Sequence, residues 1–285
     1  MFLMVGGMTM PKWLRTGLYY FTAISISLVF ILPLFWMFSA SVRQPGLPPA
    51  RTLEWFPNPI AWENYRAIFT IIPLQRYLLN SFIVAGMAIP ITLLTASLTG
   101  FGMAELGART RGLFFTLTVG LLMVPATALW LTRYMLLSWL GITDSYLALI
   151  APAFMGTSPL FILLYYWTFR RIPVDEFEAA RLDGAGAFAV WWQIALPQTR
   201  PTTMAVTILT FMFYWNDFIN PLLYLKSQSL YTLAVGLQQL QQLDKTNWPI
   251  LLAAAVVMSL PSLLLFGFLQ RFFLSDERLS ELLGR

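Results

Sequence analysis

The chain has 285 residues, of which 58% are hydrophobic and only 11% are charged, and its mean hydropathy is +0.68. Because a soluble domain carries about 25% charged residues, this composition excludes a water-soluble globular protein and predicts an integral membrane protein. The chain has no cysteine and no histidine, which excludes disulfides, thiolate metal sites and the usual general base near neutral pH, and the net charge of +5 is spread along short loops rather than gathered into a nucleic-acid footprint.

Six segments reach the length of about 20 apolar residues that a helix needs to cross a bilayer. The first is longer than the apolar region of a signal peptide, about 7–15 residues, so we predict an uncleaved first span. The expected fold is all-α, with six transmembrane helices in a single domain over residues 1–285. The expected spans are residues 17–41, 77–103, 112–136, 146–169, 201–225 and 248–273.

Lysine and arginine predict the orientation, because they are enriched in cytoplasmic loops. With both termini in the cytoplasm, loops 104–111 and 170–200 lie inside, loops 42–76 and 226–247 lie outside, and eleven basic residues face the cytoplasm against seven on the other side. The eleven are Lys12, Arg15, Arg109, Arg111, Arg170, Arg171, Arg181, Arg200, Arg271, Arg278 and Arg285; the seven are Arg43, Arg51, Arg66, Arg76, Arg133, Lys226 and Lys245.

A polar segment separates the fourth and fifth expected spans. Pro173 can begin a helix there, two acids follow in the first turn, and Gly184 can end it, which predicts a helix over about 173–184. Phe177, Ala180 and Gly184 share one face of that helix, so we expect a single bulky side chain beside two small positions to face a partner protein. An ordinary amphipathic helix at the membrane surface is the alternative.

The same segment contains Glu178-Ala179-Ala180, then Gly184 after three residues, and Ile194-Ala195-Leu196-Pro197 after nine more. This pattern resembles the signature loop of ABC importer permeases, and every fixed position is present. The resemblance implies that the loop is a coupling helix, about 173–184, which seats in a groove of a cytoplasmic ATPase. The residues it assigns to ATPase coupling are Phe177, Glu178, Ala179, Ala180, Arg181, Asp183, Gly184, Leu196 and Pro197.

Towards the C-terminus the chain resembles the carbohydrate-uptake branch of that family, in particular the second permease subunit of maltose-type importers. The segments that carry this likeness are Trp215-Asn216-Asp217-Phe218, residues 221–224, residues 231–237 and Gln270-Arg271-Phe272-Phe273. The resemblance implies import of a sugar, such as an oligosaccharide or polyol glycoside; another solute, such as a glycerol phosphate, is the alternative. The tail, residues 275–285, departs from the small-residue tail of that subunit.

The resemblance also implies the partners: a sister permease, two cytoplasmic ATPase subunits, an extracytoplasmic solute-binding protein and membrane lipids, with no nucleic acid. The chain lacks a G-x-x-x-x-G-K-[ST] phosphate loop, so we expect no cofactor on this chain and ATP and Mg on the partner ATPases. We accordingly expect a non-catalytic, multi-pass subunit of a bacterial-type inner membrane.

Polar residues in the fifth expected span are a candidate substrate pathway. Ionisable residues in a span are costly and tend to face a cavity or a partner, and aromatic rings can stack on sugars. Packing between helices, or a place at the outer interface, is the alternative. The candidates are Tyr214, Trp215, Asn216, Asp217 and Asn220.

The outer loop 226–247 carries leucines at every third position and a Gln-rich stretch, which predicts a short amphipathic helix. In maltose-type importers the equivalent loop reaches the binding protein, so Gln238, Gln239 and Gln242 are candidate contacts with that protein. The alternative is a helix that lies passively on the bilayer, with Leu237, Leu240 and Leu243 facing lipid.

Two other classes of protein fit less well. An intramembrane serine protease needs a histidine base, and an aspartyl protease needs two acids in spans, whereas we place only Asp217 inside a helix. A secondary transporter commonly has repeated halves, and the sequence contains no internal repeat.

Overall fold

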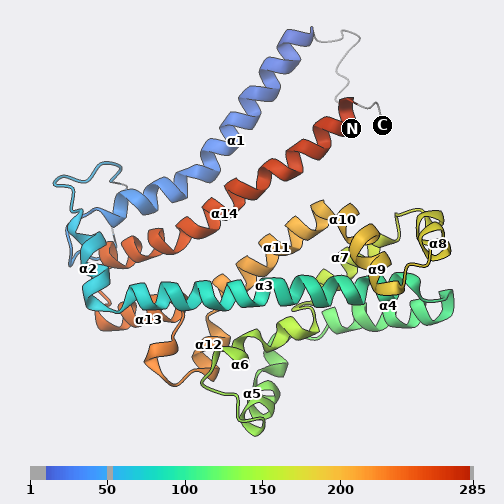
Figure 1. Cartoon of the computed structure of the whole chain (residues 1–285). Coiled ribbons are helices and arrows are strands. Elements are labelled where there is room, and N and C mark those ends of the chain that lie inside the picture. The colour runs from blue at the N-terminus through green and yellow to red at the C-terminus, as the bar shows by residue number, and fades with distance from the viewer. Residues whose placement is uncertain (1–10, 50–53, 283–285) are drawn as a thin grey trace. The chain divides into compact units, whose positions relative to one another are not determined.

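The computed structural model describes residues 11–49 and 54–282, without the side chains of Lys12 and of 271–282 (Figure 1). Within these residues the secondary structure is entirely helical, as the composition predicts. The chain divides into two compact units, which are described separately. One comprises Met1–Ile68 with Gln241–Val256, and the other Phe69–Leu240 with Val257–Arg285.

The first unit is built on α1 (Lys12–Ser41), whose most apolar stretch buries none of its side chains. Residues after α1 fold back on its end, because the Asn64 Nδ2 group at the start of α2 (Glu63–Ile71) donates hydrogen bonds to the carbonyls of Ser41 and Arg43 at 2.8 and 2.7 Å. Arg43 also pairs with Glu54 at 2.8 Å. The apolar surface of α1 is therefore left uncovered within this unit.

The second unit packs α4 (Ala108–Leu122), α7 (Pro159–Phe169) and α11 (Arg200–Trp215) along α3 (Leu74–Glu105), as Figure 1 shows. Gly100 allows the closest approach: a Cβ atom there would lie 2.7 Å from Tyr165 Cβ and 2.9 Å from the backbone nitrogen of Tyr166. The Tyr165 hydroxyl then donates to Thr203 Oγ1 at 3.0 Å, which links α7 to α11.

Four helices of the described residues are long and apolar enough to cross a membrane, or five spans if a bent pair counts as one. The bent pair corrects the continuous span expected over 112–136, since Ala108–Leu122 and Ala126–Trp139 meet at 90°. Pro125 lies at the break, where its ring disfavours helical geometry in the preceding residue. The four single helices are Trp13–Ser41, Leu74–Glu105, Tyr146–Phe169 (α6, Tyr146–Ile150; η2, Ala151–Met155; α7) and Trp248–Gln270 of α14 (Trp248–Leu282).

The fifth expected span, 201–225, is interrupted, because α11 ends at Trp215 and α12 runs only from Ile219 to Tyr224. Side chains form hydrogen bonds on both sides of the break. Asn216 Nδ2 donates to the Met212 carbonyl at 2.9 Å, and Asp217 Oδ1 accepts from the Asn220 amide at 3.2 Å. Asp217 therefore lies between two helices and not inside one, which corrects the expectation from sequence.

The helix predicted within the loop 226–247 is confirmed as α13 (Leu233–Leu243). Its buried face packs against its own chain: a Cβ at Gly236 would overlap the Tyr77 ring, and the Leu233 amide donates to Ser81 Oγ at 2.8 Å. Leu240 is buried, whereas Leu243 is 66% exposed. The leucine stripe is thus divided between the protein interior and the surface.

Some expectations lie outside the described residues. Arg51 and Arg285 are not described, and the side chains of Lys12, Arg271 and Arg278, which were assigned to the cytoplasmic side, are not described either. The same holds for the side chains of the tail over 275–285.

Candidate functional site

The polar segment forms α8 (Val174–Leu182), within the range predicted from sequence. Pro173 precedes its first residue with an extended backbone, and Asp175 and Glu176 occupy the first turn, where the helix dipole favours negative charge. Arg181 lies in the last turn, where the dipole favours a cation. The distribution of charge therefore agrees with the helix ends.

Gly184 ends α8 in a Schellman motif. Its φ is +89°, its amide donates to the Arg181 carbonyl at 3.0 Å, and the Ala185 amide donates to the Ala180 carbonyl at 3.0 Å. An L-residue rarely adopts this left-handed geometry. The glycine of the signature pattern is therefore explained by the backbone of the chain itself.

One face of α8 is turned inward, which corrects the expectation that Phe177 and Ala180 face a partner. Phe177 is 4% exposed and Ala180 is 9% exposed. The Phe177 ring meets Phe101 of α3 edge-on at 5.8 Å, and Phe101 meets Phe169 of α7 in the same way at 5.5 Å. An amphipathic helix buries its apolar face in a membrane protein as it does in a soluble one. Treating Phe177 and Ala180 as the apolar face of such a helix would have predicted that they pack against the rest of the chain.

The opposite face of α8 is exposed and consists of Asp175, Glu178, Ala179 and Leu182, which follow one another at helical spacing. We call these four residues the exposed face of α8. Leu182 is 89% exposed, an unusual position for a leucine at the end of a polar helix. Leu182 was not selected from sequence, although it lies four residues after Glu178 and therefore on the same face of the helix.

Polar contacts fix α8 to neighbouring segments. Arg181 forms an ion pair with Glu105 at the end of α3, and Gln198 Nε2 donates to Glu176 at 2.7 Å. Asp183 and Gly184 are exposed. Glu105 was not identified from sequence, because only the tertiary structure brings it to α8.

The chain continues through α9 (Ala187–Ala189), the π-helical turn η3 (Val190–Ala195) and α10 (Leu196–Gln198). Trp191 of η3 is 1% exposed and joins the same core as Phe177. Leu196 and Pro197 of the signature pattern line an open cavity of about 370 Å³ together with Trp192 and Arg200. The second half of the pattern therefore borders a surface hollow beside the start of α11.

The five pathway candidates separate into two groups. Tyr214 and Trp215 are buried: Trp215 Nε1 donates to the Met258 carbonyl at 2.9 Å and its ring stacks on Phe211 at 5.0 Å. Asn216 is exposed, and Asp217 and Asn220 are half-buried and hydrogen-bonded to each other at 2.8 Å. For the two aromatic residues this arrangement favours the alternative of helix packing.

The three glutamines of α13 also differ. Gln239 Oε1 accepts a hydrogen bond from the Tyr77 hydroxyl at 2.9 Å, Gln238 is half-buried, and Gln242 is exposed. Gln239 therefore already has a partner within the chain.

Long apolar helices with lipid-accessible faces, a broken helix pair and a short polar helix anchored to the ends of α3 and α7 define a multi-pass membrane transport component. The family described as "binding-protein-dependent transport system inner membrane component" matches residues 73–278, and the chain belongs to this family of non-catalytic permease subunits of ABC importers.

Curated relatives agree with the family. The chain is 31% identical over 254 residues to the arabinooligosaccharides transport system permease protein AraQ of Halalkalibacterium halodurans, covering 88% of this chain and 90% of that protein. It is 29% identical over 251 residues to the sulfoquinovosyl glycerol transport system permease protein SmoH of Agrobacterium fabrum, covering 88% of each.

Solved structures share the fold. A chain of a bacterial ABC transporter involved in the import of alginate matches with a TM-score of 0.76 at 17% identity, covering 94% of this chain and all of that one. A second structure, an alginate ABC transporter in complex with a periplasmic protein bound to an alginate pentasaccharide, matches with a TM-score of 0.65 at 14% identity, covering 90% and 93%.

Proposed function

We propose that this permease moves a sugar or sugar-like solute, such as an oligosaccharide or a polyol glycoside, into the cytoplasm. The observation that carries the proposal is the 31% identity over 88% of the chain to a permease named for arabinooligosaccharides. The relative named for sulfoquinovosyl glycerol, a polyol glycoside, supports the same class of solute.

The proposed assembly contains a sister permease, two cytoplasmic ATPases that carry the ATP and Mg, and an extracytoplasmic binding protein. The bare apolar surface of α1 supports a neighbouring lipid or subunit in this assembly. The binding protein is supported by the alginate transporter of similar fold, whose structure includes a periplasmic protein. No nucleic acid takes part, and this chain binds no cofactor of its own.

The solute is tested by purifying the complex and measuring ATPase activity with the binding protein present. We expect stimulation by oligosaccharides or polyol glycosides and no stimulation by sn-glycerol 3-phosphate. Stimulation by the glycerol phosphate alone would contradict the sugar and support the alternative solute. The absence of any bound ATPase would contradict the proposed assembly.

We further propose that α8 is the coupling helix and that its exposed face docks on the ATPase. Glu178 and Leu182 project from the helix without a partner among the described residues, whereas Phe177 packs against α3. A displacement of α8 would reach α3 and α7 through the aromatic row and through the Arg181–Glu105 ion pair. ATP binding would then shift the population from the inward-facing to the outward-facing state.

The docking of α8 is tested with two single variants, Glu178→Lys and Leu182→Arg. Both side chains are exposed, so we expect normal insertion, loss of ATPase in a pull-down and loss of transport. Glu63→Lys is the matched control, because it makes the same charge reversal at an exposed residue of α2, on the predicted outer side. Wild-type transport by both α8 variants would refute the docking face.

The proposed topology has six spans with both termini in the cytoplasm. It counts the bent pair as one span and α11, the break and α12 as another. A cysteine introduced at Ala187, which is exposed, should resist an impermeant thiol reagent in intact cells and react after the cells are opened. Labelling in intact cells would contradict the orientation.

The outer loop and the broken span remain candidates for contact with the binding protein and the solute. We propose that Gln238, Gln239 and Gln242 contact the binding protein, with Gln239 exchanging its bond from Tyr77 for one to the partner. Alanine at all three should reduce the stimulation of ATPase activity by the loaded binding protein and leave the basal activity unchanged; unchanged stimulation would refute the contact. Asn216, Asp217 and Asn220 are the proposed polar part of the pathway.

A further inference from the structure

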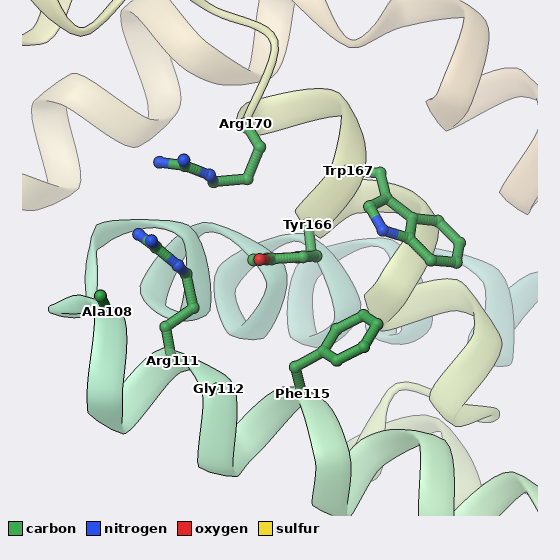
Figure 2. Close-up of a pocket in the computed structure, with 7 residues that line it drawn as sticks. All are labelled: Ala108, Arg111, Gly112, Phe115, Tyr166, Trp167 and Arg170. Carbon is green, nitrogen blue, oxygen red and sulfur yellow. The ribbon is translucent and has the colours of Figure 1, made fainter.

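A second pocket, of about 290 Å³, lies between the start of α4 and the end of α7, apart from the exposed face of α8. Its charged and aromatic lining comes from Arg111 and Phe115 of α4, Tyr166 and Trp167 of α7, and Arg170 directly after α7 (Figure 2). The volume is several times the roughly 30 Å³ that a water molecule occupies. The pocket can therefore hold a polar group larger than water.

The pocket is basic. Figure 2 shows the guanidinium groups of Arg111 and Arg170 on the same side, with the Tyr166 hydroxyl pointing towards them. Arg111 donates one hydrogen bond, to the Leu106 carbonyl at 3.2 Å. Within the described residues neither arginine pairs with a carboxylate, since Glu105, at the nearby end of α3, is already paired with Arg181. Several guanidinium donors are thus left for an anion.

The backbone adds to this preference. The N-cap of α4 is Gly107, which has no side chain to cap the first turn, and that turn contains no acid. The positive end of this 15-residue helix, where the pocket residues Ala108 and Arg111 lie, is therefore not compensated by a capping side chain or by an acid of its first turn.

The rest of the pocket suits the region where a bilayer meets water. Phe115 lies 5.8 Å from the Tyr166 ring and 6.4 Å from the Trp167 ring, and Trp167 is 44% exposed. Further along α4, Leu113 and Leu117 are 59% and 54% exposed. Aromatic rings prefer the depth of lipid headgroups, and exposed leucines next to them fit acyl chains.

We infer that this pocket binds the phosphate of an anionic glycerophospholipid. Arg111 and Arg170 hold the phosphate oxygens, while Phe115 and Trp167 contact the glycerol and the first acyl carbons. A soluble phosphate would use the arginines equally well but would gain nothing from the aromatic and leucine surface. The site requires only that the chain is a membrane protein, and it does not depend on the proposed solute or on the docking of α8.

The test is native mass spectrometry of the delipidated full-length protein, titrated with dioleoyl phosphatidylglycerol or dioleoyl phosphatidylcholine. The pocket variant is Arg111→Gln/Arg170→Gln. The matched control is Arg109→Gln/Arg171→Gln, which removes the same charge from exposed residues at the same helix ends that do not line the pocket. We expect the pocket variant to bind phosphatidylglycerol about tenfold or more weakly and the control to change less than about twofold, since a hydrogen bond to a charged group contributes about tenfold in affinity.

Three results would overturn the inference. Equal losses in the two double variants would show unspecific attraction to surface charge. Equal affinity of the wild type for the two lipids would show that the anionic headgroup is not recognised. Complete displacement of phosphatidylglycerol by millimolar inorganic phosphate would identify a soluble ligand. If the pocket variant does not fold, Arg111→Lys/Arg170→Lys replaces it, and the two wild-type comparisons still decide the outcome.

Discussion

The end of α8 provides a quantitative prediction about the glycine of the signature pattern. Gly184 has a φ of +89°, and no atom lies within 4 Å of the position that a Cβ would take there. Alanine at this position therefore causes no clash and only the backbone strain of a left-handed L-residue, about 1–2 kcal/mol. That free energy corresponds to an equilibrium factor of about 5–30 for opening the helix end.

Hydrogen exchange of the segment 174–186 measures this opening. In Gly184→Ala we expect the amide of Ala185, which donates to the Ala180 carbonyl, to exchange about 5–30 times faster than in the wild type. Gly184→Asn should accelerate exchange less, because asparagine tolerates the left-handed region better than alanine does.

Gly186→Ala is the internal control for this experiment. Gly186 has an ordinary φ of −72° and also has open space around it, so alanine there adds no strain. Both substitutions reduce the conformational freedom of the unfolded chain by the same amount. The difference between their exchange rates therefore reports the free-energy cost of the left-handed backbone at position 184. Equal exchange rates in Gly184→Ala and Gly186→Ala would refute the reasoning.

Two further predictions concern packing and pH. Gly100→Ala should lower the melting temperature of the solubilised protein, because the new Cβ meets the backbone of α7 at Tyr166 and overpacking costs about 1–3 kcal/mol; Gly102→Ala, in open space, should not, and equal effects would contradict the close contact. In the loop before α6, hydrogen bonds from the Ser227 hydroxyl and amide and from the Lys226 amide lower the pKa of Asp144. The Asp144 carboxylate therefore stabilises the folded state above its unfolded pKa of about 3.9, and this stabilisation is lost as the pH falls through the lower folded pKa. Asp144→Asn should therefore melt below the wild type at pH 7, and the difference should shrink towards pH 3; a difference independent of pH would contradict this linkage.

The family and its membrane character could be predicted from sequence because both depend on local properties. A run of apolar residues must be helical in lipid wherever it lies, since its backbone groups have no other partners. The helix over about 173–184 likewise followed from residues at its own ends, namely Pro173 and Gly184. The glycine was a reliable signal because its backbone geometry is excluded for most other residues.

The tertiary structure decided which faces and which breaks matter. Phe177 was expected to face a partner, yet it is buried, because it packs against Phe101 of α3, which lies 76 residues earlier in the chain. The break at Asn216 and Asp217 also was not predicted, because apolar residues lie on both sides of it. Only the structure shows that these two side chains hydrogen-bond to the adjoining helix ends. Hydropathy records whether a residue favours lipid or protein over water, but it does not distinguish lipid from protein. In this chain that distinction depends on contacts between distant segments, so it was available only from the folded structure.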